Sequence, residues 1–116
     1  MAMNKQVKMK WVKALRSGHY KQGFGTMRDQ NDCFCVLGVL CNIHAQENPE
    51  VANKQFSKRS YLGSSGSLPY QVQKWAGLTS DSPMVGTYPN QSSLITLNDS
   101  RKLSFKELAG IIEFGM

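Results

Sequence analysis

The sequence predicts one small α+β domain over residues 1–116, with about four helices and a small antiparallel sheet of two to four short strands. Three observations support this fold class. The chain has 116 residues, close to the commonest size of a single domain. Several segments carry apolar residues at helical spacing. The segments between them are rich in Gly, Pro, Asn and Asp, which favour turns and leave room only for short strands.

The first helix is expected over residues 4–16. Its apolar stripe consists of four residues at helical spacing, Val7, Trp11, Ala14 and Leu15. The opposite face carries three basic residues, Lys10, Lys13 and Arg16. Gly18 follows, and glycine suits the left-handed position just after a helix. We therefore expect an amphipathic helix with one buried face and one basic face.

Residues 18–32 are rich in turn formers, and residues 24–28 could form a short strand. Asp32 is a candidate N-cap for the next helix, which is expected over residues 33–45. This is the most apolar stretch of the chain, and periodicity alone cannot separate a buried helix from a buried strand there. Its length favours the central core helix. Gly38 would cost such a helix about 1 kcal/mol relative to alanine, so we expect another backbone segment to pack closely against it.

Residues 46–67 are polar and precede a short helix, expected over residues 68–77. Pro69 suits a position near the first residue of that helix, and Gly77 suits its end. Residues 79–93 form a long loop, and loops of this length are often functional. The loop either acts as a lid or contains a short strand around residues 84–88.

The last part of the chain predicts a strand and a helix. Residues 94–97 are expected as a strand, and Asn98 and Asp99 as the turn after it. Ser104 and Glu107 match the capping box that starts a helix. The apolar stripe of this C-terminal helix consists of Phe105, Leu108, Ala109 and Ile112.

The formal net charge of +6 is concentrated at the start of the chain. The first 28 residues contain seven basic residues and no acidic one: Lys5, Lys8, Lys10, Lys13, Arg16, Lys21 and Arg28. The remaining 88 residues contain seven basic and eight acidic residues. This asymmetry predicts one positive surface that attracts anions such as phosphates, nucleic acid or an acidic protein. The alternative is a solvated helix face that only keeps the protein soluble.

Residues 18–28 combine the groups that could hold a nucleotide. Glycines let backbone N–H groups approach a phosphate, basic side chains supply charge, and aromatic rings can stack on a base. The predicted ligand-binding residues are His19, Tyr20, Lys21, Gln22, Gly23, Phe24, Gly25 and Arg28, next to the basic face of Lys10, Lys13 and Arg16. The segment matches neither a P-loop nor the dinucleotide fingerprint. The alternative is a hairpin whose glycines serve turns and whose aromatic residues enter the core.

The three cysteines, Cys33, Cys35 and Cys41, lie within nine residues of an apolar segment. This arrangement favours reduced core thiols over a disulfide framework. Cys41 and His44 would lie side by side on a helix, but they supply only two zinc ligands, so we predict no metal or other cofactor. A thiol nucleophile with His19 or His44 as its base remains an alternative. The eight acids are scattered singly and form no catalytic pair.

Neither a membrane span nor a signal peptide is expected. No apolar run reaches the 18 residues that a transmembrane helix needs. The N-terminus has no apolar stretch followed by a small-residue cleavage site. With reduced cysteines, these features favour a reducing cytosol.

Six motifs in fixed order resemble a known family: Trp11-Val12-x-Ala14-Leu15-Arg16-Ser17-Gly18, Tyr20-Lys21-Gln22-Gly23-x-Gly25, Phe34-Cys35-x-Leu37-Gly38-Val39-Leu40-Cys41, Leu68-Pro69 with Trp75-x-Gly77-Leu78, Leu97-Asn98-Asp99, and Ser104-Phe105-x-Glu107-Leu108-Ala109. The order resembles that of short, mostly uncharacterised accessory proteins of tailed phages and prophages. The likeness spans most of residues 11–112, without residues 46–67 and 79–93. Phe24 and Val36 depart from the pattern, since an Arg and a second Cys would be expected there.

The resemblance implies a phage origin and a location in the host cytoplasm. Small phage accessory proteins often counter host defence, so we expect an anti-defence binding protein that sequesters a phosphate-containing, nucleotide-type signal without cleaving it. Such proteins are usually oligomers, because ligand pockets often form between subunits. The first alternative is an inhibitor that binds a host defence protein or nucleic acid through the basic face of the first helix. The second alternative is a small cysteine-dependent enzyme.

Overall fold

Five helices and four two-residue strands make up the part of the chain that the computed structural model describes, residues 3–50, 60–62, 64–86 and 90–116. The helices are α1 (Lys5–Arg16), α2 (Val36–Glu47), α4 (Tyr70–Ala76), α5 (Leu94–Asp99) and α6 (Phe105–Gly115). The strands are β1 (Lys21–Gln22), β2 (Cys33–Phe34), β3 (Met84–Val85) and β4 (Ser92–Ser93). The chain is therefore mixed helix and strand, as predicted, with one more helix than expected.

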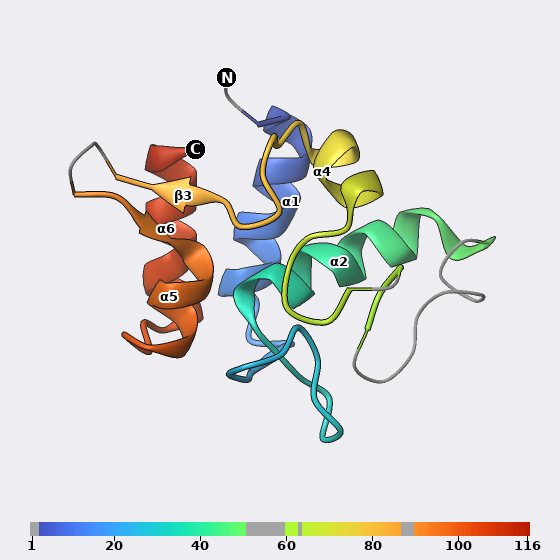
Figure 1. Ribbon diagram of the computed structural model, residues 1–116, viewed down its shortest axis with the longest axis horizontal. Coiled ribbons are helices and arrows are strands. Elements are labelled where there is room, and N and C mark those ends of the chain that lie inside the picture. Colours follow the sequence, from blue (N-terminus) through green and yellow to red (C-terminus); the bar gives the residue numbers. More distant parts are fainter. Residues whose placement is uncertain (1–2, 51–59, 63, 87–89) are drawn as a thin grey trace.

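Helix α1 forms where its pattern predicts it and lies at the centre of the fold (Figure 1). Asn4 caps it, because its Oδ1 accepts a hydrogen bond of 3.0 Å from Val7 N. Gly18 ends it with φ +79°, as predicted. Trp11 is fully buried, and its indole N–H donates to the carbonyl of Val36 at 2.9 Å. The apolar face of α1 packs against both α6 and α2.

Most residues of helix α2 are buried, as predicted for a core helix, but the helix begins three residues later than predicted. The prediction that Asp32 caps it is wrong: Asp32 has φ +58°, its carboxylate pairs with Arg28, and Cys35 is the N-cap residue. Cys33 and Phe34 form strand β2 instead of the first helical turn. The expected close packing at Gly38 is confirmed, since a Cβ there would lie 1.7 Å from the carbonyl oxygen of Met27.

The prediction of one small antiparallel sheet is wrong, because the described strands form two separate pairs. Strand β1 pairs with β2 in parallel, with Lys21 opposite Cys33, while β3 and β4 form a separate antiparallel pair. Residues 24–28 do not form the expected strand, and only Arg28 makes an isolated bridge, to Phe34. The strand expected around 84–88 is found as β3, and residues 87–89 lie outside the described part of the chain.

The strand predicted at residues 94–97 is also wrong, because these residues begin helix α5. Ser93 caps this helix: its Oγ accepts a hydrogen bond of 3.1 Å from Thr96 N. Leu94, Leu97 and Asn98 are buried on one side, at helical spacing. Asn98 and Asp99, expected as a turn, are the last two residues of the helix.

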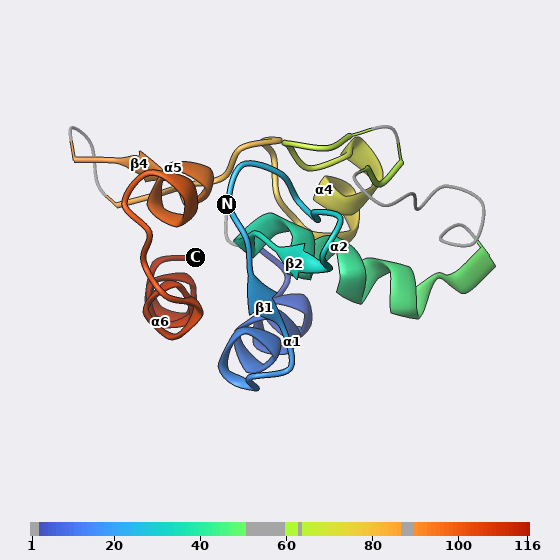
Figure 2. The same ribbon diagram turned by 90° about the horizontal axis from the view of Figure 1, so that it is seen from below.

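The two remaining helices agree with their predicted ends. Gly77 ends α4 with φ +74°, and Pro69 precedes its first residue. Ser104 and Glu107 form the predicted capping box of α6. Figures 1 and 2 show α5 and α6 on one side of α1, and α2 and α4 on the other. In the described part of the chain, no helix is long and apolar enough to cross a membrane.

Candidate anion-binding pocket

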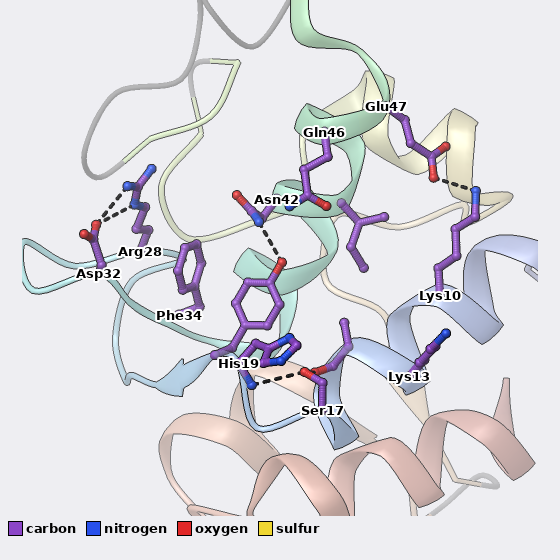
Figure 3. A pocket seen from close by; sticks show the side chains of 13 residues that line it. Lys10, Lys13, Ser17, His19, Arg28, Asp32, Phe34, Asn42, Gln46 and Glu47 are labelled. Atoms are coloured by element: carbon purple, nitrogen blue, oxygen red, sulfur yellow. Dashed lines mark hydrogen bonds and ion pairs between the residues drawn. The ribbon is translucent and has the colours of Figure 1, made fainter.

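A surface pocket of about 740 Å³ lies between α1 and α2. Figure 3 shows its side chains, which come from both helices, from the turn after α1 and from the segment around β2. From α1 and its C-cap the lining residues are Lys10, Lys13, Ala14 and Ser17, and from α2 they are Asn42, Ile43, Gln46 and Glu47. Residues three and four apart share a face of a helix, so one face of each helix borders the pocket.

Tyr20 forms an ordered aromatic wall of the pocket. Its ring packs edge-on against Phe34, with 5.2 Å between the ring centroids and an interplanar angle of 89°. Its hydroxyl accepts a hydrogen bond of 2.6 Å from the side-chain amide of Asn42. Contacts at both ends of the side chain hold the ring in place, and Tyr20 is only partly exposed. Contacts within the protein therefore fix the position of this wall.

Three cations of the described residues line the pocket, and two of them are paired with acids. The Nζ of Lys10 lies 2.5 Å from Glu47 Oε2, and the guanidinium of Arg28 lies 2.8 Å from Asp32 Oδ1. Arg28 also lies over the ring of Phe34, with Cζ 5.5 Å from its centroid.

Lys13 and His19 complete the polar lining. Both are exposed, and within the described residues the side chain of Lys13 has no hydrogen bond or ion pair. The backbone N–H of His19 donates to Ser17 Oγ at 3.1 Å, which fixes the turn that carries its ring. The charges of the three cations exceed those of the two carboxylates by one, and Lys13 carries the uncompensated charge.

The structure brings together five of the eleven residues predicted from the sequence. Lys10, Lys13, His19, Tyr20 and Arg28 all line the pocket. Arg16 does not; its guanidinium pairs with Glu113 at 2.9 Å on the α6 side of α1.

The other predicted residues lie outside the pocket lining. The side-chain amide of Gln22 donates to Asn98 Oδ1 and to the carbonyl of Leu103, at 3.0 and 2.7 Å. Gly23 is buried against Cys33, whose Cβ would lie 2.9 Å from a Cβ at position 23. These two residues hold the loop in place. Lys21 is exposed on β1, and Gly25 turns the chain with φ +88°. Phe24 is also exposed, with Lys102 Nζ 5.4 Å from its ring centroid.

The sequence analysis missed the contribution of α2 and β2 to the pocket. It placed Phe34 and Asn42 in a core helix, whereas both line the pocket with Gln46 and Glu47. One signal was present: Asn42 is the first polar side chain after nine apolar or small residues from Cys33 to Cys41. A polar residue within such a stretch indicates a face that leaves the core.

The cysteines lie away from the pocket lining. Burial raises the pKa of the Cys35 thiol to about 11 and raises the pKa of Cys41 well above its ordinary value. The Nδ1 of His44 lies 2.6 Å from the hydroxyl of Tyr61, and the Sγ of Cys41 lies 3.6 Å from the sulfur of Met27. Among the described residues, no group of three or more His, Cys, Asp or Glu could hold a metal ion. Thiols with raised pKa values are poor nucleophiles at neutral pH.

The model of one family, Domain of unknown function (DUF8296), matches residues 3–115. The chain belongs to this family. No curated protein and no solved structure matches the chain. The family description assigns no ligand, so the proposal below is based on the geometry of the pocket.

Proposed function

We propose that this protein is a binding module that holds a phosphate-containing, nucleotide-type ligand in the pocket between α1 and α2. The observation that carries the proposal is the position of Lys13. This cation lacks a partner among the described residues and borders a pocket with an ordered aromatic wall at Tyr20. A free cation beside an aromatic surface matches the two halves of a nucleotide, the phosphate and the base.

The pocket has suitable groups for each part of such a ligand. Its volume of about 740 Å³ falls within the range of small-molecule sites. The ring of Tyr20 and the side chains of Ala14 and Ile43 form an apolar surface for a base. The amides of Asn42 and Gln46, one turn apart on α2, supply donors and acceptors for a base edge. These contacts would orient the ligand, while Lys13 attracts its phosphate.

Binding without cleavage is proposed because the two acids of the described pocket lining, Asp32 and Glu47, lie at opposite ends of the pocket. Carboxylates placed in this way do not form the acid and base pair that cleavage of one bond uses. Burial raises the pKa values of the Cys35 and Cys41 thiols, which disfavours these two residues as the nucleophile of a cysteine-dependent enzyme.

The biological part of the proposal is based on the motif resemblance. As a phage accessory protein in the host cytoplasm, the molecule would sequester a nucleotide-type defence signal, as a homo-oligomer. A second candidate is an inhibitor that binds a host protein or nucleic acid through α1. One observation favours it: a groove of about 470 Å³ between α1 and α6 has Met9, 70% exposed, beside Lys8 and Arg16. An exposed apolar residue among cations suits an acidic partner surface.

A thermal-shift screen tests the proposed pocket. Adenine and guanine mono-, di- and cyclic nucleotides are added singly to the purified protein. A binder at about 100 times its Kd should raise Tm by roughly 10 °C. Lys13→Ala should weaken binding about tenfold, since it removes a lining cation that has no competing acid among the described residues.

Lys106→Ala is the matched control for Lys13→Ala, because Lys106 is an exposed lysine on α6 outside the pocket. It removes the same charge and should leave ligand affinity unchanged. Equal weakening by both variants would indicate a nonspecific attraction to net charge. No shift with any nucleotide would contradict the proposal.

A further inference from the structure

Two ion pairs stand at opposite ends of the candidate pocket. Figure 3 shows Arg28 with Asp32 at one end, and Lys10 with Glu47 at the other, on the side where Lys13 also lies. Asn42, whose side-chain amide donates to the hydroxyl of Tyr20, lies between the two ends. The cationic groups of the pocket are therefore divided between two separate places.

Each pair is partly exposed, so its carboxylate can be displaced. The side chains of Lys10 and Glu47 are 50% and 36% exposed, and those of Arg28 and Asp32 are 29% and 69% exposed. Ion pairs in contact with water contribute only about 0–1 kcal/mol. A phosphate offers more charge and more acceptor oxygens than a carboxylate. Each acid thus occupies a place that a phosphate of the ligand can take.

We infer that the pocket takes a ligand with two anionic groups at separate positions, one held by Lys10 and Lys13 and the other by Arg28. The inference rests on the proposed function and specifies its ligand class. A nucleotide with phosphates at two positions of its sugar, or on two sugars, meets this requirement. A diphosphate chain on a single position of the sugar places both phosphates at one end of the pocket. The ion pair at the other end then stays intact.

Two isomeric arrangements of phosphate on one nucleoside test the inference. Adenosine 3′,5′-bisphosphate and ADP have the same base, sugar and number of phosphates, but only the first separates its phosphates. Isothermal titration calorimetry should show at least about tenfold tighter binding of the bisphosphate, equivalent to about 1.4 kcal/mol. AMP should bind more weakly than the bisphosphate. Equal or tighter binding of ADP would overturn the inference.

Two variants that each remove one negative charge provide a second test, and the expected result is tighter binding. Misfolding would weaken binding, so it cannot produce this result. Glu47→Gln and Asp32→Asn each remove one internal competitor and should each improve bisphosphate affinity about two- to fivefold. AMP affinity should improve with only one of the two variants. Asparagine tolerates the left-handed backbone of position 32, where φ is +58°. An equal increase in AMP affinity in both variants would contradict the inference that the two ends of the pocket hold different anionic groups.

Glu113→Gln is the matched control for both variants. Glu113 forms a similar exposed pair with Arg16, at 2.9 Å, outside the pocket. It should leave the affinity for every adenosine phosphate unchanged, and an equal gain would show that only the net charge matters. If the wild-type protein binds none of AMP, ADP and the bisphosphate, the proposed function fails together with the inference. If it binds all three equally, the inference alone fails.

Discussion

Asn98 Oδ1 accepts a hydrogen bond of 3.2 Å from the backbone N–H of Val36, a residue 62 positions earlier in the chain. Val36 is the first residue of α2, where backbone N–H groups have no partner within the helix. Asn98 also donates from Nδ2 to the carbonyl of Gly23 at 2.9 Å. This fully buried side chain of α5 therefore caps α2 and anchors the loop before it.

Asn98→Ala should destabilise the protein by about 3 kcal/mol, since it leaves the N–H of Val36 and the carbonyl of Gly23 buried without partners. Urea unfolding followed by tryptophan fluorescence measures the change. Asn31→Ala is the control, because Asn31 is exposed in a turn and should shift stability by less than about 0.5 kcal/mol. A loss at Asn98 no larger than at Asn31 would refute the capping role.

Gly38→Ala and Gly110→Ala should change stability in opposite directions, although both glycines lie inside helices. A Cβ at position 38 would lie 1.7 Å from the Met27 carbonyl oxygen, so the loop carrying Met27 must move; we expect a loss of about 3 kcal/mol or more. No atom lies within 4 Å of a Cβ at position 110, where alanine should add up to about 1 kcal/mol. Thermal unfolding of the pair tests this, and equal effects would contradict the packing described.

Stability should fall as pH drops below about 6.5, through His44. Burial is the main cause that lowers the pKa of His44 below its ordinary value of 6.5, and the charge of Glu47 opposes it only in part. Protons therefore bind the unfolded chain more tightly than the folded one. The contribution of neutral His44 is complete above pH 6.5 and is lost as pH falls toward the lowered pKa.

The difference in Tm between the wild-type protein and His44→Gln, measured at pH 7.5 and at pH 5, isolates this effect. Glutamine keeps a polar group near the hydroxyl of Tyr61, which lies 2.6 Å from His44 Nδ1. The wild-type protein should lose more Tm than the variant between these two pH values. An equal loss would assign the acid sensitivity to the carboxylates instead.

Thiol labelling at pH 7.5 should distinguish Cys33 from the other two cysteines. Cys33 is partly exposed, whereas Cys35 and Cys41 are buried and have raised pKa values. Iodoacetamide followed by peptide mass spectrometry should find Cys33 modified first, and all three modified only in denaturant. Rapid modification of Cys35 in the folded protein would instead support the alternative that the protein is a cysteine-dependent enzyme.

Local patterns were sufficient for the elements whose ends depend on neighbouring residues. The buried stripe of α1, and the capping box formed by Ser104 and Glu107 in α6, follow from positions three or four residues apart. The close approach at Gly38 was also predictable, because glycine inside an apolar helix needs a packing reason. Short-range patterns determine the first two features, whereas the position of Gly38 inside an apolar helix indicated a close contact without identifying Met27 as its partner.

The predictions failed where a short segment was compatible with two local structures. Residues 94–97 have the apolar content of a strand, but burial of Leu94, Leu97 and Asn98 on one side selects the helix, and Ser93 provides its cap. Asp32 was a reasonable cap from its position in the chain. Its left-handed backbone and its pairing with Arg28 prevent that role, which Asn98 fills from α5.

The sequence indicates which basic and aromatic residues are candidates for a binding site. It does not indicate which of them line the same pocket. Lys13 and Arg28 line opposite ends of one pocket because α1 and the segment before β2 both lie against α2, an arrangement that depends on long-range packing. The same packing directs Gln22 into the interior and brings Asn42 to the wall of the pocket. The sequence by itself determines the chemical type of each side chain. Which side chains share a surface depends on contacts between residues far apart, because burial of the common apolar core sets how the helices lie.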